Sequence, residues 1–332
     1  MVEKMINVGF LGAGQFAKSM AEVIHRTDDV NLFAVASRDS ERSAALKPAH
    51  VYDNYADLLA SPDVDLVYVL LSNDLHFPWV MAALAHGKNV ICEKPLGLDA
   101  EETALMFDAA EAAGLILVEA YWHLWHPRFA LAKSLIAAGT IGEVISINSG
   151  FTHATDFGSN FRSNDAQGGG MLLDLSCYPI SAATYLLDLP VLSRPLILER
   201  EPKSGGVEMH LKATADLGSI SLTVTVSAQR EADRWFDVLG TTGSISFEHP
   251  AFSDAPEPIS GTVLTCTVEG VDQEWHVPAS DPRSLMVAEI ANAITSKRNG
   301  AEPQWSFRPD PKLSILTAHA IDVLKKAELT DF

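Results

Sequence analysis

The chain has 332 residues, which leaves room for two domains, and its apolar share of 47% is ordinary for a packed globular protein. Its 43 acidic side chains outnumber its 24 basic ones, so the formal charge at pH 7 is −19. A charge of this sign repels nucleic-acid phosphates and anionic lipid surfaces at long range. We therefore expect no nucleic acid and no membrane among the partners, and a small molecule as the substrate.

Residues up to about 119 alternate short apolar runs with stretches of helical period, the pattern of βαβ units that build a parallel sheet. The predicted strands are 6–11, 31–36, 66–71, 89–92 and 116–118, and the predicted helices are 15–26, 56–59, 77–86 and 100–113. Gly87 and Gly114 stand where helix ends favour a residue that tolerates positive φ. The pattern predicts an α/β fold whose N-terminal domain, residues 1–122, is a Rossmann doubly wound parallel sheet.

The pattern changes after Glu119. We predict helices at 129–138, 170–187, 282–298 and 311–327, and strands at 144–150, 196–199, 208–215, 219–227, 235–239, 244–247, 262–268 and 274–277. Short turn-rich gaps at 216–218 and 240–243 favour antiparallel pairing. Residues 123–332 are therefore predicted to form an α+β substrate-binding domain with an open, mostly antiparallel sheet. Such a sheet needs cover on its second face, so we expect a homodimer or homotetramer formed through it.

A glycine-rich turn follows the first predicted strand. Its sequence fits G-x-G-x-x-A: Gly12 suits the tight turn, Gly14 allows close approach of a pyrophosphate, and Ala17 permits close helix packing. A turn without a ligand is the alternative. The cofactor-binding residues predicted here are Gly12, Gly14, Gln15, Phe16 and Ala17.

The end of the second strand decides between the two dinucleotides, since an acidic residue there accepts from ribose hydroxyls and a basic one accommodates a 2′-phosphate. Here Ser37 can donate a hydrogen bond and Arg38 can fork onto phosphate oxygens. The alternative makes Arg38 a solvated residue beside a helix cap formed by Ser37 or Asp39, and Asp39 would suit NAD. We favour NADP, with NAD left open.

Two further segments carry residues suited to chemistry. Glu93-Lys94-Pro95 follows a strand of the parallel sheet, at the edge where such sheets bind ligands. A run of three glycines, 168–170, feeds a helix on which Asp174 and Tyr178 share one face, and Pro179 is expected to bend that helix. An ammonium favours a nearby phenolate, so Lys94 would let Tyr178 act as a base while hydride leaves the adjacent carbon.

Three motifs in this order and spacing resemble those of the Gfo/Idh/MocA oxidoreductases: Gly12-x-Gly14-x-x-Ala17, Glu93-Lys94-Pro95, and Gly168-Gly169-Gly170 with Asp174 and Tyr178. The resemblance covers essentially the whole chain. It implies a Rossmann domain followed by an open antiparallel sheet, Lys94 as a catalytic lysine, and a cis peptide before Pro95. Tyrosine at 178, where many members carry histidine, resembles the branch with dimeric dihydrodiol dehydrogenase, glucose-fructose oxidoreductase and NADP-dependent xylose dehydrogenase, which usually prefers NADP.

The sequence also departs from that family. Relatives often have glycine where this chain has Ser176, and an arginine near Leu124, so the inherited substrate is in doubt. Residues expected to touch cofactor are Ser72, Asn73, His76, Glu93 and Lys94; a helix cap and a solvated histidine are the alternatives for Asn73 and His76. Residues expected to touch substrate are Trp122, His123, Asp156, Phe157, Arg162 and Tyr178, although surface polarity would also explain Asp156 and Arg162.

No metal is predicted. Three histidines, His123, His126 and His153, lack an accompanying carboxylate with ligand spacing, and hydride transfer needs no metal. Three widely spaced cysteines without a Cys-x-x-Cys pair suggest reduced thiols in the cytoplasm.

The sequence therefore predicts an NADP-dependent dehydrogenase that oxidises a hydroxyl of a neutral aldose or polyol, with Lys94, Asp174 and Tyr178 as catalytic residues. A trans-dihydrodiol dehydrogenase or a carbonyl reductase would use the same groups. A non-catalytic NADP(H)-binding regulator is the alternative from another class.

Overall fold

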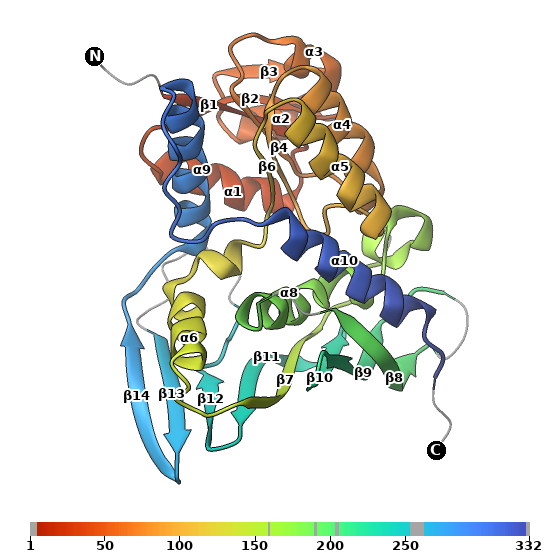
Figure 1. The fold of residues 1–332 in the computed structure, drawn as a ribbon. Coiled ribbons are helices and arrows are strands. Elements are labelled where there is room, and N and C mark those ends of the chain that lie inside the picture. Colours follow the sequence, from red (N-terminus) through yellow and green to blue (C-terminus); the bar gives the residue numbers. More distant parts are fainter. Residues whose placement is uncertain (1–4, 159, 189–190, 203–205, 253–261, 330–332) are drawn as a thin grey trace. The chain divides into compact units, whose positions relative to one another are not determined.

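A computed structural model describes residues 5–158, 160–188, 191–202, 206–252 and 262–329 of the chain, which forms two compact units (Figure 1). The first unit consists of Met1–Gly97, Glu102–Trp125 and Asp281–Pro311, and the second of Leu98–Glu101, His126–Ser280 and Lys312–Phe332. The predicted boundary at residue 122 divides the chain once, whereas each observed unit is made of three separate segments of the chain. The segment Asp281–Pro311 thus belongs to the first unit, and the chain after it to the second.

The first unit is built on a six-stranded parallel sheet in the order β3-β2-β1-β4-β5-β6, the doubly wound arrangement expected from the sequence. Its strands are β1 (Ile6–Leu11), β2 (Val30–Ala36), β3 (His50–Tyr52), β4 (Leu66–Val69), β5 (Asn89–Cys92) and β6 (Leu117–Glu119). Every residue of β4 and all but one of β1 are buried, as expected for strands covered on both faces. The strand order reverses between β1 and β4, where open α/β sheets bind ligands.

Helices flank this sheet: α1 (Gln15–Arg26), α2 (Ser40–Ala45), α3 (Tyr55–Ala60), α4 (His76–Ala85), α5 (Ala100–Ala112) and α9 (Pro282–Arg298), with the 3-10 turns η1 (Asn73–Leu75) and η2 (Trp122–Trp125). Gly87 and Gly114 have φ of 71° and 64°, as the helix-end prediction required. The short elements α2 and β3 were not predicted. The helix α9 packs against α1 and η2 (Figure 1).

The second unit is built on an eight-stranded sheet in the order β14-β13-β12-β11-β7-β10-β9-β8. Only β7 and β10 run parallel; the other neighbours are antiparallel, including the pairs joined by the two predicted turns. The strands are β7 (Val144–Ala154), β8 (Leu192–Glu201), β9 (His210–Leu217), β10 (Ile220–Ser227), β11 (Gln229–Gly240), β12 (Gly243–Phe247), β13 (Thr262–Val268) and β14 (Val271–Val277). The predicted mostly antiparallel sheet is therefore confirmed.

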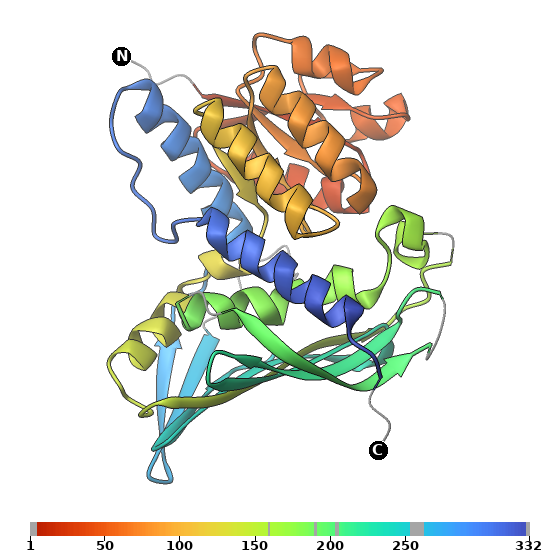
Figure 2. The same cartoon turned by 45° about the vertical axis from the view of Figure 1, so that its right-hand side comes forward.

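Helices cover one face of this sheet (Figure 2): α6 (Pro127–Ala137), α7 (Met171–Leu175) and α8 (Cys177–Leu186). Residues of β10 alternate accordingly, with Leu222, Val224 and Val226 buried on the helix side and Thr223 half-buried on the other. The last helix, α10 (Pro311–Lys326), is tied to the edge strand β8 by Arg200, which donates to two backbone carbonyls near the end of that helix, both at 3.0 Å.

The predicted helix over 170–187 is two helices, α7 and α8, separated at Ser176. Pro179 has no N–H, so the carbonyl of Leu175 receives no helical bond from it. The Ser176 hydroxyl donates to a carbonyl one turn earlier, a bond that also bends helices. The bend expected at Pro179 thus lies three residues before it, and Pro179 falls in the first turn of α8, where proline is tolerated.

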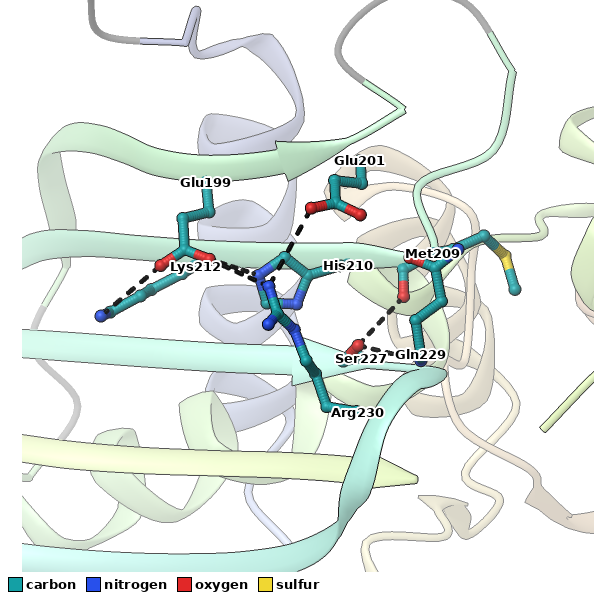
Figure 3. Close-up of polar contacts among 8 residues, drawn as sticks. All are labelled: Glu199, Glu201, Met209, His210, Lys212, Ser227, Gln229 and Arg230. Carbon is teal, nitrogen blue, oxygen red and sulfur yellow. Dashed lines mark hydrogen bonds and ion pairs between the residues drawn. The ribbon is translucent and has the colours of Figure 1, made fainter. Parts of the chain in front are cut away.

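Charged side chains cross the strands at the β8 edge of this sheet (Figure 3). The carboxylate of Glu199 lies 3.0 Å from Nε2 of His210 and 3.3 Å from Nη2 of Arg230. The hydrogen bond from His210 lowers the pKa of Glu199. Charges on an edge strand discourage the addition of another strand, so this edge is protected.

Candidate functional site

The turn between β1 and α1 has the geometry that a dinucleotide requires. Gly12 has φ of 109°, and a Cβ there would lie 2.5 Å from the backbone oxygen of Leu70, so only glycine fits. A Cβ at Gly14 would meet no atom within 4 Å, which means that the space beside the start of α1 is open. No side chain caps α1, so its first N–H groups are available to an anion. Ala17 is buried against the sheet, Phe16 is half-buried and Gln15 is exposed.

After the end of β2, Arg38 lies between Ser37 and Asp39, whose side chains make hydrogen bonds within the chain. The Ser37 hydroxyl donates to the carbonyl of Asp39 at 2.7 Å and lies 2.8 Å from the Ser43 hydroxyl. The Asp39 carboxylate caps α2 by accepting from the N–H of Arg42, and it also pairs with the Arg42 side chain at 3.0 Å. Arg38 is exposed. Asp39, rather than Ser37, is therefore the helix cap, and this use of Asp39 disfavours it as a ribose ligand.

Lys94 follows β5 and precedes the cis peptide bond to Pro95. Its side chain is only 9% exposed. The carboxyl of Glu93 accepts a hydrogen bond from the Tyr68 hydroxyl at 2.6 Å. Burial raises the pKa of Glu93, while the Tyr68 hydrogen bond and the charges of Lys94 and Arg283 counteract that rise. The half-buried carboxyl of Glu93 thus accepts from a phenol and experiences the charges of Lys94 and Arg283.

His76 opens α4 and is fully buried, which excludes the solvated alternative. Its Nδ1 lies 2.8 Å from the carbonyl oxygen of Pro95, and its Nε2 lies 3.2 Å from that of Leu71. Burial lowers the pKa of its ring, which disfavours the imidazolium. The ring therefore joins the segment after β4 to the segment after Lys94. Asn73, in the turn before α4, is also buried, and Ser72 is half-buried.

The glycine run shapes the entry to α7. Gly168 and Gly170 have φ of 72° and 101°, and a Cβ at Gly169 would lie 2.6 Å from the carbonyl oxygen of Arg162. The run therefore lets the preceding loop fold back onto α7. Nε of Arg162 then donates to Oδ2 of Asp174 at 2.7 Å, and the guanidinium lies over the Phe161 and Phe157 rings at 4.6 and 5.8 Å.

Tyr178 lies on α8, 6% exposed, against an aromatic cluster. Its ring centroid is 5.1 Å from that of Phe151 and 5.9 Å from that of Phe252. The guanidinium of Arg234 lies 4.4 Å from the Phe151 ring centroid and donates to the Phe252 carbonyl at 3.1 Å. Sequence reasoning missed Arg234, because only the register that pairs it with Phe151 brings it here, and register is not readable from the sequence.

The other predicted substrate residues differ in how far they are buried. Trp122 and His123 are buried in η2, and the Trp122 ring lies 4.9 Å from the guanidinium of Arg283. Asp156 is exposed and accepts from the N–H of Gly158 at 2.9 Å. Lys94 thus belongs to the first unit, and Asp174, Tyr178 and Arg162 to the second.

No group of three or more His, Cys, Asp or Glu side chains is arranged to hold a metal ion in the part of the chain that the structure describes. Over the same residues, no helix is both long and apolar enough to cross a membrane.

Two family models match the chain. The model described as "Oxidoreductase family, NAD-binding Rossmann fold" (GFO_IDH_MocA) covers residues 6–121, and the model of the "GFO/IDH/MocA C-terminal domain" covers residues 129–246.

Individual proteins are similar along the whole chain. D-xylose 1-dehydrogenase (NADP(+)) 2 from Haloferax volcanii is 32% identical, over 97% of each chain. A dTDP-3,4-didehydro-2,6-dideoxy-alpha-D-glucose 3-reductase from Streptomyces violaceoruber is 30% identical, over 98% of this chain and 96% of its own. The crystal structure of a 3-ketoreductase from Actinomadura kijaniata, in complex with NADP and TDP-benzene, superposes with a TM-score of 0.86 over 98% of each chain, at 24% identity.

Proposed function

Because the chain belongs to the GFO/IDH/MocA family of oxidoreductases, we propose that it is an NADP-dependent dehydrogenase that oxidises a hydroxyl of a neutral aldose or polyol. The observation that carries this proposal is a pair of side chains on α7 and α8. Tyr178 is buried, and Asp174, which lies one turn before it, accepts a hydrogen bond from Arg162. The similarity to an NADP-dependent xylose dehydrogenase over the whole chain supports the substrate class.

The cofactor assignment rests on two places, the turn between β1 and α1 and the end of β2. Gly12, Gly14 and the free N–H groups of α1 would hold the pyrophosphate. The exposed Arg38 would bind a 2′-phosphate, while Asp39 is already used as a helix cap. NADP fits this arrangement better than NAD. When bound, the nicotinamide supplies a hydride acceptor or donor.

In the proposed mechanism, Tyr178 takes the proton of the substrate hydroxyl while hydride leaves the carbon that carries it. Lys94, from the first unit, stabilises the phenolate with its ammonium group. Asp174 orients the reacting groups, and Arg162 fixes that carboxylate at 2.7 Å. In the reverse direction Tyr178 returns the proton to a carbonyl oxygen, so one set of side chains serves oxidation and reduction.

A second candidate function is the reduction of a keto group on a nucleotide-linked sugar. The Arg234 guanidinium beside Phe151 favours this candidate, because it adds a positive charge next to the aromatic cluster that holds Tyr178. A cation there suits a substrate that carries phosphate. The similarity to sugar 3-reductases supports the same candidate.

The test is reduction of NADP, followed by nicotinamide absorbance, across aldoses, inositols and trans-diols, with NAD in parallel and with oxidation of NADPH by keto sugars as the second arm. Turnover of a free sugar supports the first candidate, and turnover of only a nucleotide-linked keto sugar supports the second. The variant Tyr178→Phe should lose at least about a hundredfold in kcat and keep its NADPH affinity, since only the proton transfer is removed. An unchanged kcat would refute the catalytic assignment of Tyr178. NADPH binding without turnover of any substrate would favour a non-catalytic regulator.

A further inference from the structure

Arg128 is a buried cation that the proposed mechanism does not use. It is the second residue of α6, and it is 1% exposed. Burial lowers the pKa of its guanidinium to about 10, so the group is still charged at neutral pH. Removing a charge from water is costly, and the dipole of a helix opposes a cation in its first turn. A guanidinium kept in such a place needs an explanation.

The guanidinium of Arg128 binds the backbone of the segment that follows β12. Its Nη1 donates to the carbonyl of Pro250 at 3.2 Å, and its Nη2 donates to the carbonyl of Ala251. One planar fork thus holds two consecutive peptide groups, and hydrogen bonds from a charged donor are about twice as strong as neutral ones. Both bonds require this conformation of the segment, so Arg128 stabilises that conformation over others.

The same segment is also held by Arg234 on β11. The N–H of Ala251 donates to the backbone carbonyl of Arg234 at 2.7 Å, and the Arg234 side chain donates to the carbonyl of Phe252 at 3.1 Å. Arginine side chains from α6 and β11 thus bind the three carbonyls of residues 250–252. The backbone that carries Phe252 is therefore fixed by charged donors from two elements of the second unit.

Fixing this segment also places the ring of Phe252, which is completely buried. Its centroid lies 5.9 Å from that of the Tyr178 ring, and 6.4 Å from that of the Phe151 ring with the two planes almost parallel. Tyr178 therefore packs against one ring from β7 and one from the segment that Arg128 holds. In a close-packed interior a ring turns only when its neighbours move, so the position of Phe252 restricts the direction of the Tyr178 hydroxyl.

We propose that Arg128 is a positioning residue for Tyr178, acting by holding residues 250–252 so that the Phe252 ring packs against the phenol and fixes its direction. The proposal rests on the proposed function, in which Tyr178 transfers a proton. By this proposal, Arg128 itself touches neither the reacting atoms nor the substrate. Proton transfer requires the hydroxyl to lie within hydrogen-bond reach of the substrate, so a small displacement of the phenol lowers the rate.

The experiment compares Arg128→Met, which removes the charge and keeps a long side chain, with Arg128→Lys, which keeps a charge but lacks the planar fork. The matched control is Lys133→Met on the same helix. Lys133 also donates to a backbone carbonyl, that of Tyr185 at 2.7 Å, and it pairs with Asp188 at 2.7 Å. The control therefore removes a cation of the same kind that holds α6 without binding residues 250–252.

In Arg128→Met we expect kcat to fall about tenfold or more, because the phenol is displaced. NADPH affinity, measured by nicotinamide fluorescence, should stay the same, since the residues proposed to bind the cofactor belong to the first unit and Arg128 to the second. Arg128→Lys should recover part of the lost kcat. Lys133→Met should keep the kcat of the wild type, even if the protein melts earlier.

Double variants distinguish positioning from a general loss of structure. If Arg128 acts through the Tyr178 phenol, Arg128→Met should not lower the residual turnover of Tyr178→Phe any further. If it acts through the Phe252 ring, its effect on kcat should be smaller in a Phe252→Leu background. A general loss of structure would instead lower turnover by the same factor in every background.

A readout that needs no turnover is the fluorine NMR spectrum of the protein labelled with 3-fluorotyrosine. The resonance that is lost in Tyr178→Phe is that of Tyr178. Arg128→Met should shift and broaden this resonance, and Phe252→Leu should do the same, whereas Lys133→Met should leave it in place. Phe252→Leu keeps both arginines, so it tests the same contact if Arg128→Met does not fold.

An unchanged Tyr178 resonance in Arg128→Met or in Phe252→Leu would overturn the proposal. So would an equal loss of turnover on Arg128→Met in the wild-type and Tyr178→Phe backgrounds. The failure of the proposed function is seen separately, because turnover that survives Tyr178→Phe removes the catalytic role of Tyr178. The fluorine spectrum still decides whether Arg128 positions its ring.

Discussion

Arg38 is flanked by side chains whose hydrogen bonds are made within the chain. Ser37 is bonded to Asp39 and Ser43, and Asp39 caps α2. These local bonds fix the backbone at the end of β2 and leave the guanidinium as the group that faces outward. Selectivity for the dinucleotide is therefore expected to depend on this one side chain.

Replacing Arg38 with alanine should weaken NADP binding by about 10- to 100-fold, the equivalent of one charge-assisted hydrogen bond of ~1.5–3 kcal/mol. NAD affinity should change little. The matched control is Arg42→Ala, which removes a neighbouring surface arginine that pairs with Asp39. Dissociation constants from fluorescence titration decide the matter, and equal losses for both dinucleotides would contradict the assignment.

His126 is a neutral helix cap in a buried place. Its Nδ1 accepts from the N–H of Arg128 at 3.3 Å at the start of α6. Burial, with a smaller effect of the Arg128 charge, lowers the pKa of the ring from 6.5 to about 3. Protonation of Nδ1 would break the cap and place a second positive charge beside Arg128, whose guanidinium is itself buried.

The sign of the resulting pH dependence follows from this lowered pKa. Above pH 6.5 the ring is neutral in the folded and unfolded chain, and as the pH falls toward 3 only the unfolded chain takes up the proton. His126 should therefore lower the free energy of unfolding by about 1.4 kcal/mol per pH unit in that window. His126→Asn keeps a capping side chain without a titration, so its stability measured by urea unfolding should fall less steeply with acidification. Parallel slopes for the two proteins would contradict the prediction.

At the scale of elements, the glycine run before α7 determines how the preceding loop folds. The carbonyls of Arg162 and Asn164 lie 2.6 and 2.7 Å from the place that a Cβ of Gly169 would take. The same loop carries the guanidinium that pairs with Asp174. The packing of one glycine therefore positions the carboxylate of Asp174, which we propose to be catalytic.

Gly169→Ala should push this loop away from α7, cost about 1–3 kcal/mol of stability through overpacking, and lower kcat by separating Arg162 from Asp174. Gly158→Ala is the control within the same loop region, because a Cβ there meets no atom within 4 Å. It should cost only about 1–2 kcal/mol for its left-handed backbone and leave kcat nearly unchanged. Thermal melts and steady-state kinetics on both variants separate the clash from the backbone strain.

Elements with a strong hydrophobic period were predicted nearly to the residue. Five of them, β1, α1, β5, β13 and α9, have the predicted bounds, because apolar period and terminal signals agree there. The elements α2 and β3 were missed. Their segment carries mostly exposed polar residues, and β3 is held by its pairing with β2 rather than by an apolar face. The division of the helix at Ser176 was predicted as a bend but placed at Pro179.

At the scale of the whole chain, the second unit has helices on one face of its sheet, while no helix of its described residues covers the other (Figure 2). Thr223 lies on that uncovered face, in a strand between β7 and β9. We expect this face to form the contact between copies of the chain, as the sequence suggested, because a broad sheet is stable when both faces are covered.

A charge placed in the middle of this face should separate the copies. Thr223→Glu is expected to reduce the sedimentation coefficient to that of a monomer, since a buried carboxylate without a partner is costly. Ala137→Glu introduces the same charge at an exposed position of α6 and should leave the assembly intact. An assembly that both variants retain would show that the sheet face is not the interface.

Some residues of the candidate site could be predicted from the sequence and others could not, for a physical reason. Gly12, Lys94 and Tyr178 lie in contiguous motifs whose function requires a fixed spacing. Arg234 and Arg283 reach their places through strand register and through the return of α9 to the first unit, respectively. Contacts between segments this far apart leave no local signal, so they had to be seen in the structure.

The return of α9 also sets the order in which the protein can be completed during synthesis. The strands of the first sheet and α1 leave the ribosome early, but the helix that packs against α1 is translated only after nearly all of the second unit. Domains generally fold as their chain emerges, N-terminal part first. Until residue 311 is made, the side of α1 that α9 will cover is exposed, and Arg283 is absent from its place between Phe16 and Trp122. A nascent chain thus lacks the contact of Arg283 with Phe16, at the start of the helix that we propose to hold the dinucleotide, until its second unit has been made, and we expect cofactor binding to be a late event in the life of each molecule.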